Sequence, residues 1–267
     1  MTATTRRRPP AVAGTFYPDD AASLAAQLDE LVPPGVTGPA PKALIVPHAG
    51  YVYSGPVAGH GYATLRAARD RIERVVLLGP AHRVPVRGLA TTSADEWVTP
   101  LGAVTIDDAA RQAVLAVPNV EIDDRAHADE HSLEVHLPFL QHTLRRFSAL
   151  PLVVGRADPE TVAAVLDTVW GGPETLIVVS TDLSHYLDHA TASARDRRTA
   201  EAIVAGRPDM IRLDDACGAH PVRGLLLAAR RHGLRTRLLD LRNSGDTAGP
   251  SDRVVGYGAF SLSEATP

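Results

Sequence analysis

The stretch ALIVPHAG, residues 43–50, indicates both the fold and the position of a functional site. Its first four residues are aliphatic without alternation, which is typical of a strand covered on both faces. A proline, a histidine and a glycine follow, so the strand ends in a turn that carries an imidazole. In open α/β sheets, sites form beyond the carboxyl ends of strands, where this turn lies.

Other apolar runs of strand length alternate along the chain with patterns of helical spacing. This alternation predicts a layered α/β protein, and three shorter segments make a mixed, largely parallel sheet the expected form. We predict strands over residues 43–46, 74–78, 88–93, 102–106, 150–154, 175–180, 235–241 and 254–262. We predict helices over residues 21–31, 130–147, 160–170, 193–204 and 222–231.

Length and composition limit the function classes. The 267 residues are 45% hydrophobic and 22% charged, which fits one folded domain over residues 1–267. The net charge is −4 (27 basic minus 31 acidic residues), so neither nucleic acid nor an anionic membrane is the expected partner. No apolar run reaches the roughly 20 residues of a membrane span. Residues 1–10 are basic and are predicted as a flexible arm, not a secretory signal.

Three predicted strands each deliver a histidine just beyond their ends. His48 follows residues 43–46, His82 follows residues 74–78 and His185 follows residues 175–180. One such histidine is ordinarily a loop or capping residue. If these strands are parallel, however, all three imidazoles face one edge of the sheet, where neutral imidazole is the commonest metal ligand.

Cys217 is the only cysteine, which excludes an internal disulfide and favours a cytoplasmic location. It lies just before the predicted helix 222–231, where the helix dipole eases thiolate formation. A thiolate is both a soft metal ligand and a nucleophile. The alternative is a small buried residue, as most lone cysteines are.

Residues 127–139 form the densest polar cluster. On a helix, Glu134 shares a face with Glu130 at spacing four and with His131 at spacing three, which suits a metal or an acid–base pair. The alternative is an ordinary helix start, with Asp129 as N-cap and acidic residues in the first turn. Both interpretations remain open at this stage.

Five of these segments, taken in order, resemble the Memo-like proteins, which include the B component of the AmmeMemoRadiSam system. The similarity extends from about residue 9 to residue 262 and also covers AGTFYP at residues 13–18. The five segments are PHAGY at residues 47–51, LGPAH at 78–82, DEHSLEVHLP at 129–138, STDLSH at 180–185 and CGAHP at 217–221.

The resemblance implies an αβα sandwich similar to class III extradiol dioxygenases, whose non-haem Fe(II) is held by two histidines and a carboxylate. By this resemblance His48 and His82 are metal ligands and His185 is the acid–base histidine. Cys217 takes the place of the carboxylate, which softens the site toward Cu(I) or zinc. One ion is expected, iron or copper, with zinc as a further option.

The resulting prediction is a metal-binding redox protein. Asp182 is expected to orient His185, and His131 and Glu134 are expected to line the cleft. Two other functions stay open: a binding module that uses the same cleft for a peptide or partner, and a surviving ring-cleaving dioxygenase. The resemblance also implies two partners, a radical S-adenosylmethionine protein and an accompanying small protein.

Overall fold

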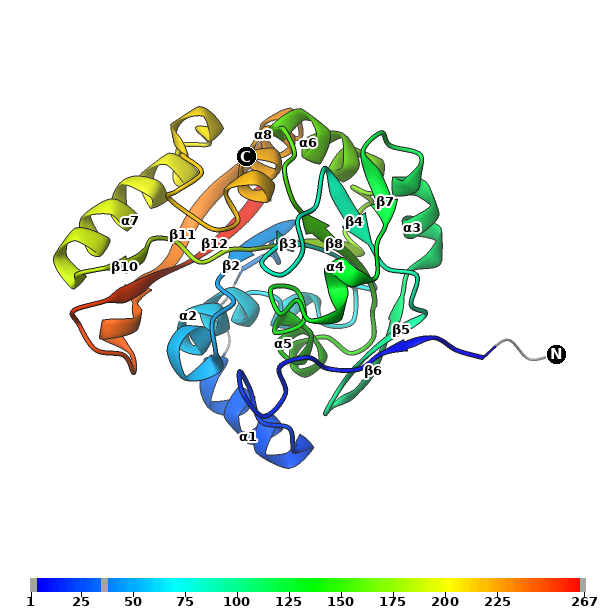
Figure 1. Ribbon diagram of the computed structural model, residues 1–267, viewed down its shortest axis with the longest axis horizontal. Helices are drawn as coiled ribbons and strands as arrows, with labels where there is room; N and C mark the ends of the chain where they lie inside the picture. Colours follow the sequence, from blue (N-terminus) through cyan, green and yellow to red (C-terminus); the bar gives the residue numbers. More distant parts are fainter. Residues whose placement is uncertain (1–3, 35–37, 265–267) are drawn as a thin grey trace.

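Residues 43–46 form β2 in the middle of a mixed sheet. The computed structural model describes residues 4–34 and 38–264. Over these residues the sheet has the order β1-β5-β6-β8-β3-β9-β2-β12-β10, with β11 on β12 and β4 between β7 and β8. The central strands β8, β3, β9 and β2 are parallel, and β12 is antiparallel to β2. Helices cover both faces (Figure 1), which confirms the predicted largely parallel αβα architecture.

Most predicted elements are present with small changes of bounds. The strands are β1 (Arg7–Arg8), β2 (Ala43–Val46), β3 (Arg74–Pro80), β4 (Leu89–Thr91), β5 (Glu96–Thr99), β6 (Gly102–Ile106), β7 (Val120–Ile122), β8 (Ser148–Val154), β9 (Thr175–Ser180), β10 (His185–Leu187), β11 (Leu234–Asn243) and β12 (Val254–Glu264). The α-helices are α1 (Ala21–Leu31), α2 (Tyr51–Ala63), α3 (Asp108–Leu115), α4 (Arg125–Ala128), α5 (His136–Thr143), α6 (Pro159–Thr168), α7 (His189–Val204) and α8 (Ala219–Arg231).

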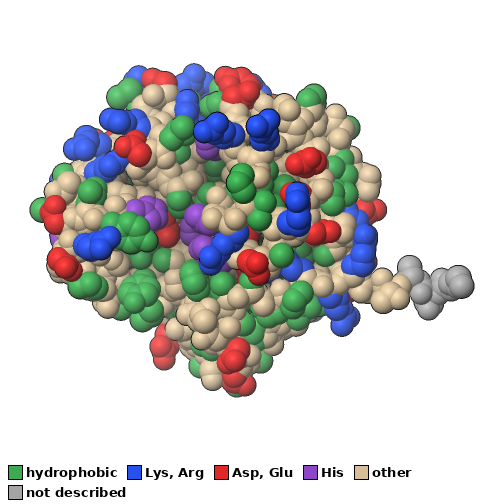
Figure 2. Space-filling model, viewed as in Figure 1, with side chains coloured by type: hydrophobic (Ala, Val, Ile, Leu, Met, Phe, Trp, Pro, Cys, Tyr) green, Lys and Arg blue, Asp and Glu red, His purple; other side chains and the backbone are tan. Residues whose placement is uncertain are grey.

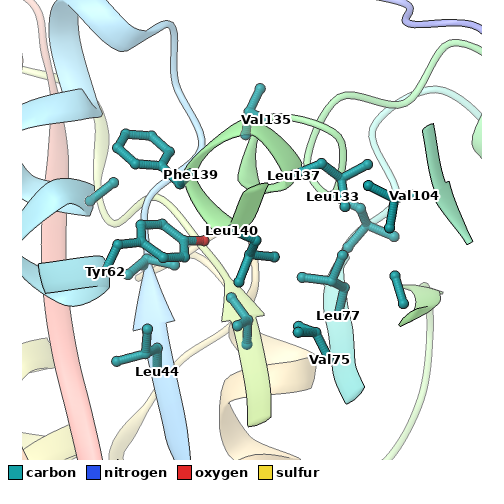
Figure 3. Close-up of a cluster of buried hydrophobic side chains, with 14 of the residues drawn as sticks. Leu44, Tyr62, Val75, Leu77, Val104, Leu133, Val135, Leu137, Phe139 and Leu140 are labelled. Atoms are coloured by element: carbon teal, nitrogen blue, oxygen red, sulfur yellow. The ribbon is translucent and has the colours of Figure 1, made fainter. Parts of the chain in front are cut away.

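Alternate side chains of the central strands build two separate cores. Leu44 of β2 belongs to the cluster under α1, α2 and α5, which Figure 3 shows from within. Ile45 points to the opposite face and joins the cluster under α3, α6 and α8. Each fully buried aliphatic side chain contributes about 1.5–3 kcal/mol. Strand β2 is aliphatic at every position because it lies between two helical layers and is buried on both faces.

Several helices begin where an aspartate caps them. The side chains of Asp20, Asp158 and Asp188 each accept a hydrogen bond from a backbone N–H three residues further on, at the starts of α1, α6 and α7. Such a cap satisfies one of the free N–H groups of the first turn and is worth about 1 kcal/mol. These caps place the helix starts.

Helix α2 was not predicted, because its sequence contains Pro56 and several glycines. The glycines are required by close packing. A Cβ on Gly59 would lie 1.9 Å from the carbonyl oxygen of Leu31, and one on Gly55 would lie 2.7 Å from the side chain of Leu31. The tight contact with the end of α1 thus outweighs the low helix propensity of glycine.

The predicted helix over residues 130–147 differs from the structure in two respects. The helix predicted over residues 130–147 is only α5, and Asp129 caps no helix start but follows the end of α4. The carboxylate of Glu130 accepts the backbone N–H groups of His131 and Ser132, each at 2.9 Å, which holds this segment as a turn.

The flexible arm predicted over residues 1–10 is wrong for its described part. Arg7–Arg8 pairs with β5 as a parallel strand, and the Arg8 side chain is buried. Residues 1–3 lie outside the described residues. In the part of the chain that the structure describes, no helix is long and apolar enough to cross a membrane.

Candidate metal centre

The ends of three strands converge as predicted. Because β3, β9 and β2 are parallel neighbours, their carboxyl ends meet at one edge of the sheet. His48 follows β2, His82 follows β3, and Asp182 and His185 follow β9. A cleft of about 600 Å³ lies at this edge and is lined by these four residues together with His131. Figure 2 shows histidine side chains gathered at a hollow in this face of the molecule.

Three imidazoles form the centre of this site. One potential ligand atom from each of His48, His82 and His131 lies within 4.8 Å of the other two. The ring centroids of His48 lie 5.1 Å from His82 and 5.6 Å from His131, and those of His82 and His131 are 4.9 Å apart. Three nitrogen donors at these separations can share one ion.

His48 is the buried member of the cluster, with 2% of its surface exposed. Its Nδ1 hydrogen-bonds with the hydroxyl of Ser180 at 2.5 Å, and its backbone N–H donates to Asp182 at 2.8 Å. With Nδ1 engaged, Nε2 is the atom left to bind an ion. Burial lowers the pKa of His48 well below its usual value, and the neighbouring His82 and His131 add to this effect. The ring is therefore neutral and its lone pair is available near neutral pH.

His82 is oriented by a carboxylate. Glu130 accepts both the backbone N–H of His82, at 2.6 Å, and a hydrogen bond from its Nδ1, at 2.9 Å. Burial alone raises the pKa of Glu130, but the hydrogen bonds and charge of His82 outweigh it and bring the pKa to about 2. An ionised carboxylate on Nδ1 directs Nε2 of His82 toward the cleft, as in the carboxylate–histidine pairs of known metal sites.

His131 contributes the third imidazole, where we predicted only a residue lining the cleft. Its ring packs on Phe16 at 4.7 Å, and burial lowers its pKa. Among the described residues, its buried Nδ1 makes no hydrogen bond, although it lies 3.4 Å from the Glu130 carboxylate. A buried imidazole nitrogen without a hydrogen bond is costly unless something else binds it. The neutral state of His48 and the three converging imidazoles therefore fit a transition-metal ion.

Cys217 lies beside this cluster, next to His48. Its sulfur is 3.4 Å from His48 Nε2, but the group of three ligand atoms within 4.8 Å does not include it. The sulfur also accepts the backbone N–H of Asp182, at 3.3 Å. Burial raises the pKa of the thiol to about 12, with a contribution from the charge of Asp182. The role of Cys217 as a ligand stays a prediction.

Asp182 and His185 enter the same cleft from β9. Asp182 is buried, which raises its pKa, and it binds the backbone of His48. His185 is exposed and begins β10. The two residues therefore lie in one cleft. Their roles, His185 as the acid–base residue and Asp182 as the carboxylate that orients it, stay a prediction.

Glu134 does not line the cleft, contrary to our prediction. It is fully buried and its carboxylate accepts from Arg8 at 2.6 Å, from Tyr17 at 2.6 Å, and from the backbone N–H groups of Ala11 and Val12. It therefore anchors the amino-terminal segment to the core. Because residues 130–135 are not helical, Glu134 and His131 do not share a face. The residue that supports the site instead is Glu130, whose sequence signal was its place in the same polar cluster.

Fold and site together define an α/β protein with a three-histidine candidate metal centre at the carboxyl edge of its sheet. The model of the family described as Memo-like protein matches residues 8–261, and the chain belongs to this family. The expected resemblance is thereby confirmed.

Curated relatives agree with this assignment. A MEMO1 family protein of Aquifex aeolicus is 38% identical over 94% of this chain and 97% of its own length. Another, from Metallosphaera sedula, is 33% identical over 97% of this chain and its own full length. The solved structure of an uncharacterized protein from Escherichia coli K12 aligns with a TM-score of 0.49 and 14% identity, covering 81% of this chain and 98% of its own.

Proposed function

We propose that this protein binds one transition-metal ion at His48, His82 and His131, with Cys217 as a further ligand. The observation that carries the proposal is the approach of three imidazole donors to within 4.8 Å of one another. Nδ1 of His48 is hydrogen-bonded to Ser180, and Nδ1 of His82 is hydrogen-bonded to Glu130. These contacts support a fixed orientation of both rings. The family resemblance favours iron or copper, and the imidazole and thiolate donors also suit zinc.

The proposed role is redox chemistry related to that of extradiol dioxygenases. A bound ion would be held by these side chains and would supply Lewis-acid or one-electron chemistry. The chain itself keeps His48 neutral by burial and holds His82 through Glu130. His185 is exposed in the same cleft and is the residue proposed to transfer a proton there. Oxygen uptake with a panel of catechols, after anaerobic loading with Fe(II), tests the dioxygenase form of this proposal.

Metal analysis of protein purified without added metal tests the site. Wild type is expected to retain about one ion per chain, and His82→Ala and His131→Ala are expected to lose most of it. His60→Ala is the matched control, because His60 lies on α2 outside the cleft and pairs with Asp240 at 3.0 Å. Equal metal content in wild type and in both cluster variants would exclude the assigned site.

Replacing Cys217 by serine separates the two ligand sets. If the thiolate binds the ion, the variant loses the intense sulfur-to-metal absorption of the copper-loaded or cobalt-loaded protein. If only the three imidazoles bind, that absorption is absent from wild type as well. The spectrum of the wild type alone therefore decides whether the sulfur is a ligand.

A second function, ligand binding without turnover, is favoured by the aromatic lining of the cleft, which includes Phe16, Tyr53, Tyr186 and Tyr257. Binding that survives complete removal of metal would support this function over the redox role. From the sequence resemblance alone, we also propose association with a radical S-adenosylmethionine protein and an accompanying small protein. Co-elution of the purified proteins in size-exclusion chromatography tests that association.

A further inference from the structure

The outer part of the cleft carries positive charge that nothing described in the chain neutralises. Arg83, just after His82, and Arg253, just before β12, both line the cleft and both are exposed. Within residues 4–34 and 38–264, neither guanidinium makes a salt bridge. An arginine of this kind presents five donors in a planar fork that matches a carboxylate.

The acidic residues near the cleft do not balance this charge. Asp182 is the acidic residue that lines the cleft, and it is buried beneath His48. Glu130 is occupied by His82 and by two backbone N–H groups. The field in the cleft therefore favours an anion.

Tyr186 lines the same cleft and has a strained backbone conformation. Its φ of 60° is in the left-handed region, and Asn119 is the other described non-glycine residue with a positive φ. Its ring is 65% exposed and lies under the guanidinium of Arg253, 5.2 Å from the ring centroid. A strained backbone at an exposed aromatic residue is a feature of functional sites. Here it presents a flat surface next to a cation at the mouth of the cleft.

We propose that the cleft takes a small organic carboxylate, whose acid group binds Arg83 and Arg253 while its remainder faces the histidine cluster. This inference rests on the proposed function only for the part of the ligand that faces the histidine cluster. The arginines recognise the acid group of the ligand with or without a metal ion. Tyr186 contributes a planar contact to the body of the ligand.

Binding of benzoate, measured by ligand-observed NMR, tests this proposal, with benzamide as the neutral isostere and phenyl phosphate as the dianion. We expect wild type to bind benzoate at least about 10-fold more tightly than benzamide, the effect of a charge-assisted hydrogen-bonded pair. This preference is expected to disappear in the double variant Arg83→Gln/Arg253→Gln. Arg87→Gln is the matched control, because Arg87 is exposed in the same loop as Arg83 but does not line the cleft.

Three results would overturn the proposal: no preference for benzoate over benzamide, a preference that the double variant retains, or tighter binding of phenyl phosphate. A melting curve for each variant guards against misfolding, and Arg83→Lys/Arg253→Lys keeps the charge if the glutamine variant unfolds. The failure of the proposed metal site is distinguishable. If the metal site is wrong, the purified protein contains no metal but still binds benzoate through the arginines. If this inference is wrong, the metal content is unchanged and the arginine-dependent preference for benzoate is missing.

Discussion

Two cavities of about 600 Å³ lie at opposite ends of β2, one lined by Lys42 and the other by His48. At the amino end, the ammonium of Lys42 donates to the backbone carbonyls of Trp170, Gly172 and Thr175, the last two at 2.9 Å. At the carboxyl end, His131 Nδ1 makes no hydrogen bond among the described residues and lies 3.4 Å from the Glu130 carboxylate. Cavity size is the same, so the difference lies in whether the polar atoms are already satisfied.

The histidines of the two cavities show the same contrast. His232 stacks on Trp170 at 3.8 Å, and its Nε2 donates a hydrogen bond to the carboxylate of Asp167 at 2.9 Å. His48 and His131 instead face each other's rings across the cleft, with lowered pKa values. In the first cavity, the histidine is already engaged in stacking and hydrogen bonding within the protein. In the second cavity, the histidines remain neutral donors that a ligand can use. Four predictions test this difference between the two cavities.

Acidification is expected to produce the largest change, because it acts on the imidazoles buried behind the metal edge. Burial lowers the pKa of His127 to about 4 and that of His136 to about 3. Below pH 6.5 the unfolded chain binds protons that the folded protein does not, so stability is lost as pH falls. We expect a loss on the order of 1–2 kcal/mol for each of these residues by pH 5.

Chemical denaturation of metal-free protein between pH 8 and pH 5 measures this loss. Stability is expected to be nearly constant above pH 7 and to fall below 6.5. The His136→Gln variant, which cannot be protonated, should show a shallower fall than wild type. A flat profile down to pH 5 in the wild type would contradict the buried neutral state of both histidines.

Removing one imidazole from each cavity compares them directly. His48→Ala is expected to weaken metal binding by more than about 100-fold, beyond the usual effect of losing a supporting residue. His232→Ala is expected to leave metal affinity unchanged, because His232 lies in the opposite cavity. Competition with a chelator of known affinity measures both. Equal losses in the two variants would show that the histidine cluster is not the site.

Glu130→Gln sharpens the comparison within the metal edge. The amide keeps the size of the side chain but not the charge that holds His82 at 2.9 Å. Metal affinity is expected to fall by about 10–100-fold, as for other residues that orient a ligating histidine. The chelator competition used for His48→Ala applies here. Asp167→Asn is the control, because Asp167 holds His232 of the opposite cavity. An unchanged affinity would mean that Glu130 supports only the turn of residues 130–132.

Lys42→Met is expected to have the smallest effect and to act on stability alone. It leaves the carbonyls of Gly172 and Thr175 without a donor in a half-buried place, at a cost of about 1–2 kcal/mol. Urea denaturation measures this change, and metal content should equal that of the wild type. Loss of metal together with stability would contradict the separation of the two cavities.

Local sequence was sufficient for the strands and for the positions of the strand-end histidines. Apolar runs without alternation marked β2 and β9 with correct bounds, and the turn residues after them marked the sheet edge. The helix α2 was missed, because its glycines are explained only by the contact with Leu31. Helical spacing failed at residues 130–135, because hydrogen bonds to the Glu130 side chain held a turn instead of a helix.

By itself, the sequence determined that the sheet is largely parallel and that His48 and His82 leave it at one edge, because hydrophobic patterns and turn residues act over a few neighbours. Tertiary structure alone decided that His131 joins them, that Glu130 orients His82, and that Glu134 instead binds Arg8. These contacts join residues far apart in the chain. Their energy depends on burial and on which partner satisfies each polar atom, and neither is encoded in local spacing.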